Sequence, residues 1–212
     1  MTTFVYTDAI GLAGLAVALA ATPLAIPAVR RISRPRLAAL LVAVAVFVLI
    51  PLGSPSVAIL VRGVFGDLSV TTLVLIGSAI VRALTGWPTV DRRARFGLLA
   101  FISVAALALY PMALGVGMFD PYRLGYGSPR LVGGLFATAL AAWFCRCETI
   151  ATCLALATLA WACRWYESTN LWDYLLDPLA SFYALGSVAI RGVKRMAGGF
   201  RGTARGEVTA PK

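Results

Sequence analysis

The sequence predicts an all-α, polytopic membrane protein, a transmembrane helix bundle of about seven spans. Three observations predict it. Hydrophobic residues make up 60% of the 212 residues, only 13% are charged, and the mean hydropathy is +0.85. Seven apolar stretches follow one another along the chain. They are separated almost alternately by arginine clusters and by turns rich in acids, aromatics and prolines, an alternation that fixes topology in a bilayer.

The first span is residues 8–29, because a spanning helix needs roughly 20 mainly apolar residues, with about 17–25 tolerated. Thr7 is a suitable N-cap. A cluster of arginines follows residues 8–29, whereas a cleavable signal peptide carries its positive charge before the apolar run. We therefore expect a retained span with its N-terminus outside. Residues 37–52 form the second span, extended backward through Pro35, which suits a first helical turn.

The next apolar run, residues 57–65, is too short to cross and contains Arg62, so it predicts an interfacial or re-entrant segment. Pro111 is expected to kink the fourth span, and Pro178 interrupts the seventh. The fifth and sixth spans are short and joined by a tight turn, so six spans is the alternative. The third to seventh spans are residues 68–84, 96–117, 129–147, 149–165 and 171–193.

The charged residues set the orientation. With the N-terminus outside, most basic residues fall on the inner side, and the outer side keeps only Arg62, Arg123, Arg130 and Arg164. This bias predicts a cytoplasmic C-terminus. It also explains the formal charge of +10 without nucleic-acid binding. The excess of arginine over lysine and the abundant alanine are typical of a GC-rich bacterial genome, so we expect a bacterial inner-membrane protein.

The domain organisation follows from the same pattern. Residues 1–193 form one transmembrane helical domain, and residues 194–212 form a basic, Gly-rich cytoplasmic tail without a core, expected to be disordered. Electrostatic attraction to anionic inner-leaflet lipids would act on the tail. The alternative for the tail is a topology anchor. Its expected lipid-headgroup contacts are Lys194, Arg195, Arg201 and Arg205.

Three outward-facing segments combine acids with aromatic residues, and they predict a polar site open to the outside. They are residues 62–69, 119–126 and 167–178. Asp173 and Asp177 are four residues apart and would share a helical face. Asp177 would lie inside the span, where a charge must face protein or water. The candidate polar site comprises Asp67, Asp120, Asp173, Asp177, Arg62 and Arg123.

The residues of the candidate polar site could instead have purely structural roles. Tyr, Trp, Asp and Pro at the ends of spans also serve as interfacial anchors and N-caps. Asp67 and Asp173 would then favour helix N-termini through the helix dipole. Arg62 and Asp67 would pair with each other and do nothing more.

Arg62–Ser69, read as R-G-V-F-G-D-L-S, resembles a short R-G-x-x-x-D-L-S stretch in the membrane domains of lipoteichoic-acid-synthase-like phosphoglycerol transferases. The likeness covers eight residues of 212. The catalytic domain of that family, with its metal ligands and threonine nucleophile, has no counterpart here. The resemblance implies at most a related membrane scaffold.

The absence of histidine excludes histidine-ligated haem, histidine-based zinc hydrolysis and Ser-His or Cys-His nucleophiles. We expect no catalytic residues, cofactor or metal. The predicted function is a non-enzymatic accessory or lipid- or solute-handling subunit, with the bilayer and another membrane protein as partners. The alternative is a membrane-embedded transferase or hydrolase that acts on a lipid-linked substrate through its outward-facing aspartates.

Overall fold

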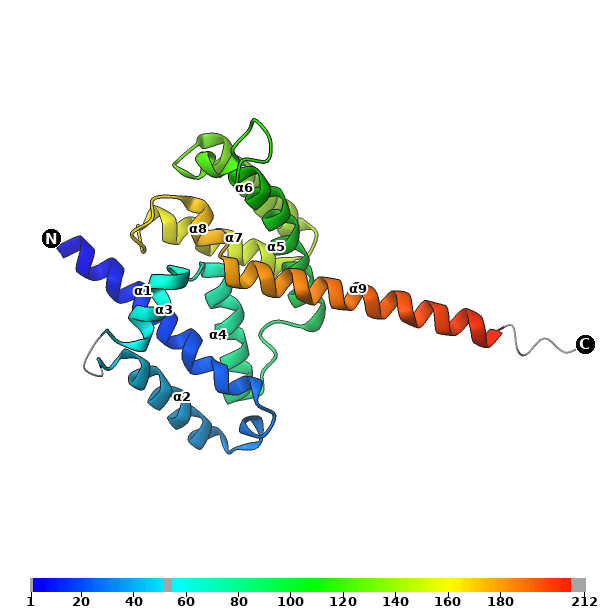
Figure 1. Cartoon of the computed structure of the whole chain (residues 1–212), viewed down its shortest axis with the longest axis horizontal. Helices are drawn as coiled ribbons and strands as arrows, with labels where there is room; N and C mark the ends of the chain where they lie inside the picture. Colours follow the sequence, from blue (N-terminus) through cyan, green and yellow to red (C-terminus); the bar gives the residue numbers. More distant parts are fainter. Residues whose placement is uncertain (1, 52–54, 207–212) are drawn as a thin grey trace, which may run out of the picture.

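The computed structural model describes residues 2–51 and 55–206, with side chains from Tyr6 to Met196 outside that gap (Figure 1). The described structure is 78% helix and contains no strand. This confirms the all-α part of the predicted fold class.

The N-terminal half is a helical hairpin with two further helices packed on it. Its elements are α1 (Thr2–Ala21), the 3-10 helices η1 (Thr22–Ala25) and η2 (Val29–Arg31), α2 (Arg34–Leu49), α3 (Val57–Phe65) and α4 (Val70–Thr85). Both α3 and α4 contact α1 and α2. Ser56 and Ser69 cap α3 and α4 by accepting backbone N–H groups. Gly86, with a φ of 82°, ends α4 in the left-handed conformation that glycine adopts without strain.

The C-terminal half packs α6 against α7 and α5 against α9. Arg146, with a φ of 59°, forms the tight turn between α6 and α7. A buried cluster of side chains from α4 to α9 holds this half together, with Leu98, Ile102 and Tyr174 each at most 1% exposed. The elements are α5 (Arg92–Ala113), η3 (Pro121–Gly125), α6 (Pro129–Phe144), α7 (Glu148–Ala162), α8 (Leu171–Leu175) and α9 (Pro178–Gly206).

Two helices of the described chain are long and apolar enough to cross a membrane, namely Tyr6–Ala25 and Arg92–Ala113. The seven-span bundle is therefore not confirmed. The helices α2, α4, α6 and α7 have 15 or 16 residues. At about 1.5 Å per residue they reach roughly 22–24 Å, against about 30 Å of hydrocarbon. Helices α6 and α7 end at Phe144 and Ala162, three residues before the predicted spans end at 147 and 165.

The seventh predicted span divides completely at Pro178. Helix α8 ends at Leu175, Leu176 is extended, and Pro178 begins α9. The prediction that Asp173 and Asp177 share one helical face is therefore wrong. Proline lacks the N–H that a continuous helix would need at this position, so Asp177 precedes a new helix instead of extending the old one.

The final helix continues beyond Val193, where the sequence predicts a tail without regular structure. Its backbone is helical to Gly206, and its C-terminal half projects away from the other helices (Figure 1). The N-terminal part of α9 packs along α5, where the Arg191 guanidinium lies 4.3 Å from the centre of the Phe96 ring.

Candidate functional site

Arg62 joins three separate parts of the chain at the end of the bundle that the sequence predicts to lie outside. Its Nε and Nη2 atoms donate to Asp67 Oδ1 and Oδ2 at 2.7 and 3.2 Å. Its Nη1 atom donates to Asp8 Oδ1 on α1 at 2.5 Å, and Glu167 Oε1 lies 4.0 Å from Nη2. The pairing of Arg62 with Asp67 is thus present, as the structural alternative expects. Asp8 and Glu167 extend it into a cluster of three carboxylates around one guanidinium.

The acids of this cluster are not equivalent. A hydrogen bond with Asp8 raises the pKa of Glu167 above its ordinary value of 4.5, and burial also raises it. The nearby Arg62 opposes this rise. Because the side chain of Glu167 is 49% exposed, solvent screens these effects and the interaction contributes little to stability.

Gly11 allows the Arg62–Asp67 pair to lie directly on α1. A Cβ atom at this position would stand 2.1 Å from Asp67 Oδ1 and 3.1 Å from Arg62 Nε. Only glycine leaves room for the ion pair against the helix backbone. Gly11 lies one turn after Asp8, so one face of α1 presents both the space and the second carboxylate.

Asp177 connects the starts of two helices. Its Oδ2 atom accepts from Ser69 N at 3.0 Å, from Ser69 Oγ at 2.7 Å and from Thr72 Oγ1, while Oδ1 accepts from Ala180 N at 2.7 Å. The residue is 3% exposed. Among the described residues it has no arginine or lysine partner. The positive ends of the α4 and α9 dipoles compensate its charge instead.

Asp173 belongs to a different network, which holds η3 against α8. Its carboxylate accepts from Tyr122 Oη at 2.8 Å and from Ser168 Oγ at 2.5 Å. Burial raises the pKa of Tyr122, and the Asp173 carboxylate raises it further, so the phenol stays protonated and donates. The fully buried Asn170 donates to the Tyr122 carbonyl and accepts from Trp172 N, at 3.0 Å each.

The remaining predicted residues take no part in a common site. Asp120 caps η3 by accepting from Tyr122 N at 2.9 Å. Arg123 is exposed, and its side chain makes no hydrogen bond or ion pair with the described residues. Lys194 and Arg195 are exposed on α9, whereas the side chains of Arg201 and Arg205 lie outside the described residues.

The four aspartates therefore gather toward one end of the bundle but form separate structural contacts. Across the described part of the chain, every buried side-chain nitrogen or oxygen has a hydrogen-bond partner. No three Cys, Asp or Glu residues of that part come close enough to hold a metal ion. These acids link helices, and none of the four aspartates lines the two pockets described below.

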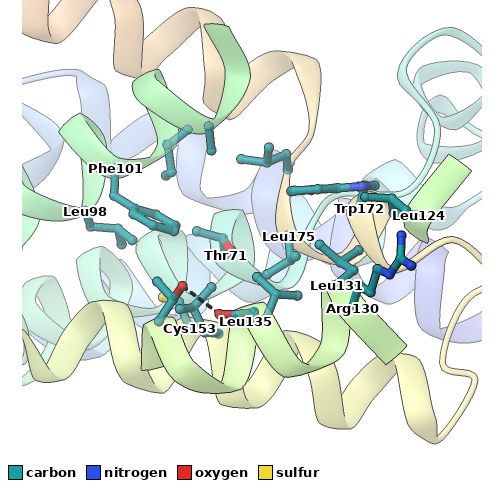
Figure 2. A pocket seen from close by; sticks show the side chains of 16 residues that line it. Thr71, Leu98, Phe101, Leu124, Arg130, Leu131, Leu135, Cys153, Trp172 and Leu175 are labelled. Carbon is teal, nitrogen blue, oxygen red and sulfur yellow. Dashed lines mark hydrogen bonds between the residues drawn. The ribbon is translucent and has the colours of Figure 1, made fainter. Parts of the chain in front are cut away.

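A mainly apolar cavity of about 350 Å³ lies beside these networks, between α4, α5, α6, α7 and α8 (Figure 2). Pockets that hold small ligands span about 300–1,000 Å³. Leu98 and Phe101 of α5 lie at one end, and Arg130 and Trp172 lie at the other, as Figure 2 shows. The Trp172 indole N–H donates to the Pro121 carbonyl at 3.0 Å, which fixes its ring at this end.

Arg130 is the cationic residue that lines this cavity, and no hydrogen bond or ion pair with the described residues engages its guanidinium. Thr138 also lines the cavity, but its hydroxyl donates to the Gly134 carbonyl at 2.7 Å. The cavity therefore offers an apolar interior and an available positive charge at one end. This arrangement fits an amphiphile with an anionic group.

Sequence reasoning missed the cavity and the contacts of Gly11, Ser69 and Asn170. A serine before an apolar run indicates a helix cap, but nothing in the sequence pairs Ser69 with an aspartate 108 residues away. Gly11 and Asn170 carry no local signal for their contacts.

No family model matches the chain, and no curated protein or solved structure matches it either. The likeness of Arg62–Ser69 to phosphoglycerol transferases therefore remains a local one.

Proposed function

We propose that this chain is a multi-pass protein of a bacterial cytoplasmic membrane that binds a lipid in its apolar cavity as a non-enzymatic, lipid-handling subunit. Its N-terminus would lie outside and its C-terminus in the cytoplasm. The two longest apolar helices support the membrane assignment, because only 28% and 33% of their most apolar windows are buried. The core helix of a soluble protein would be mostly buried. Phe136, Phe144 and Phe182 are each at least 65% exposed, as expected of side chains in contact with acyl chains.

The cavity is the observation on which the proposal of lipid binding rests. An acyl or isoprenoid chain would occupy the apolar end beside Leu98 and Phe101. An anionic headgroup would lie near Arg130, with Trp172 at the interface. Tryptophan and arginine commonly take these positions at a membrane boundary.

The aspartate carboxylates already accept hydrogen bonds from the protein, and this supports a non-enzymatic function. General acid–base or metal-assisted chemistry needs a carboxylate that can reach a substrate. The carboxylates of Asp67, Asp173 and Asp177 each accept two or more hydrogen bonds from the protein. We therefore favour the lipid-handling subunit over a transferase or hydrolase.

Filling the cavity from α6 tests the proposal. A Cβ at Gly134, which lines the cavity, would have no neighbour within 4 Å, so Gly134→Leu places a side chain in open space. Gly133 also has open space but does not line the cavity, so Gly133→Leu is the matched control on the same helix. Both variants change helix propensity alike.

The assay is photo-cross-linking in lipid nanodiscs with phosphatidylglycerol that carries a diazirine in its acyl chain. We expect labelling of Ile102, which lines the cavity and is 1% exposed, so surrounding lipid cannot reach it. Labelling should fall to background in Gly134→Leu and persist in Gly133→Leu. Absence of label at Ile102 in the wild type, or equal labelling of the two variants, would refute the cavity as a lipid site.

The headgroup contact has its own test. Arg130→Gln should weaken labelling by phosphatidylglycerol at least about tenfold, since a hydrogen bond to a charged group contributes roughly 1.5–3 kcal/mol. It should leave labelling by phosphatidylcholine carrying the same diazirine chain nearly unchanged. Arg123→Gln, which removes an exposed arginine from the same end of the protein, is the control.

A further inference from the structure

Four arginines from three elements line one pocket at the opposite end of the bundle. Arg30 comes from η2, Arg82 from the last turn of α4, and Arg92 and Arg95 from the first turn of α5. The pocket has a volume of about 550 Å³. Its apolar wall includes Leu24, Leu37 and Leu75, so the cationic groups stand beside a hydrophobic surface.

The charges of this pocket are not neutralised by the described part of the protein. The ion pairs among the described residues all belong to Arg62, and none includes an arginine of this pocket. Asp91 is the acid in the pocket lining, and its Oδ1 atom already accepts from Ala94 N at 2.5 Å as the cap of α5. Four guanidinium groups therefore face one occupied carboxylate.

Two of the arginines are held in place by neutral partners. Arg30 Nε donates to the Leu24 carbonyl at 2.5 Å. Arg95 Nη2 donates to Tyr183 Oη at 2.7 Å, and its guanidinium lies 5.9 Å from the centre of that ring. These contacts orient the side chains and leave their charge uncompensated. Arg82 and Arg92 make no side-chain hydrogen bond with the described residues, so their donors remain available.

We propose that this pocket binds the phosphate group of an anionic ligand. Arginine donates in a planar fork that matches phosphate oxygens, and it stays charged at any physiological pH. A phospholipid headgroup from the inner leaflet and a soluble phosphate ester share this chemistry. Basic pockets between helices on the cytoplasmic side suit such headgroups, and the apolar wall offers contact for the start of an acyl chain. The site is separate from the cavity at Arg130, so either can fail independently.

The test compares two double variants of the full-length protein in dodecylmaltoside. Arg82→Gln/Arg92→Gln removes two charges from the pocket. Arg36→Gln/Arg93→Gln removes two exposed charges that do not line it, from α2 and from the position next to Arg92. Both lose the same net charge, so a difference between them reports on the pocket. Unliganded melting temperatures show whether each variant folds, and Arg92→Gln alone serves if the pocket double variant does not.

The ligands are phosphatidylglycerol, phosphatidylcholine, sn-glycerol 3-phosphate and inorganic phosphate, each titrated while the melting temperature is followed by tryptophan fluorescence. A ligand that binds only the folded protein raises this temperature in proportion to its affinity. We expect stabilisation by phosphatidylglycerol, with the apparent affinity at least tenfold lower in the pocket variant and unchanged in the control. Added salt should weaken the effect.

Each outcome decides the proposal. Variant-sensitive stabilisation by phosphatidylglycerol alone supports a lipid headgroup as the source of the phosphate. Variant-sensitive stabilisation by glycerol 3-phosphate or inorganic phosphate supports a soluble source. Stabilisation that falls equally in both double variants, or that no phosphate-bearing ligand produces, overturns the proposal.

Discussion

Removing the carboxylate of Asp177 should destabilise the protein, because this group holds the starts of α4 and α9 together. In Asp177→Ala, the Ser69 and Ala180 N–H groups lose their acceptor, and both residues are at most 6% exposed. The Ser69 and Thr72 hydroxyls remain 3.1 Å apart and can still bond each other. Two buried donors left without partners, at about 1–3 kcal/mol each, cost roughly 2–6 kcal/mol.

Asp177→Asn should be milder. Its carbonyl oxygen can take the place of Oδ2 and keep the donors from Ser69 and Thr72. Its amide then faces Ala180 N, so one buried donor is lost, at about 1–3 kcal/mol. A protein of this size loses roughly 2–4 °C per kcal/mol. We therefore expect melting temperatures about 2–12 °C below wild type for Asp177→Asn, with a larger loss for Asp177→Ala.

The assay is thermal unfolding of the detergent-purified variants, together with the fraction that elutes as monodisperse protein. Asp91→Asn is the control, since it replaces an exposed helix cap with one of similar quality. If Asp177→Ala melts within about 2 °C of wild type, this carboxylate does not hold the two helices. Asp177 would then be available for function.

Two further predictions concern the Arg62 cluster. Gly11→Ala should lower the melting temperature, because its Cβ would lie 2.1 Å from Asp67 Oδ1. Gly14→Ala on the same helix is the control, since the nearest atom to its Cβ is at an ordinary distance of 3.4 Å. Equal melting temperatures of the two variants would contradict the close packing at Gly11. The raised pKa of Glu167 means that its protonated form favours folding, so this contribution is full below pH 4.5 and disappears as the pH rises through the raised value. As the pH rises from 4.5 through the raised pKa of Glu167, the melting temperature of the wild type should fall relative to that of Glu167→Gln, which cannot ionise. Parallel pH profiles of the two proteins would show that Asp8 does not share a proton with Glu167.

Local patterns identified most of the helical segments. The apolar run at Val57–Phe65, predicted as an interfacial or re-entrant segment, forms a helix over the same residues, and Pro129 begins α6 at the predicted start of the fifth span. The apolar runs were less informative about helix length. Helix α6 ends at Phe144, helix α7 ends at Ala162, and Pro178 separates α8 from α9, so the hydrophobic stretches overestimate the continuous helix. Apolar residues continue through the turns at which these helices end, so hydropathy alone does not show where the backbone turns.

The candidate site was predicted in composition but not in arrangement. The acids Asp67, Asp173 and Asp177, which the sequence predicts to face outward, lie toward one end of the bundle. Their partners are nevertheless separate, because Asp177 bonds to the start of α4 and Asp173 bonds to Tyr122 of η3. Sequence spacing describes neighbours along one helix, and it cannot identify hydrogen bonds between residues that are 50 or 100 positions apart.

The sequence by itself determined that the chain is helical, that its surface is apolar, and that its charges gather at the helix ends. These properties depend on local propensity and hydropathy, which each residue carries with it. Only the tertiary structure decided which charges are neutralised. Among the described residues, folding brings three carboxylates to Arg62 and leaves Arg130 and the arginines of the four-arginine pocket without an ion pair. Electrostatic compensation depends on distance in space, and only helix packing sets that distance.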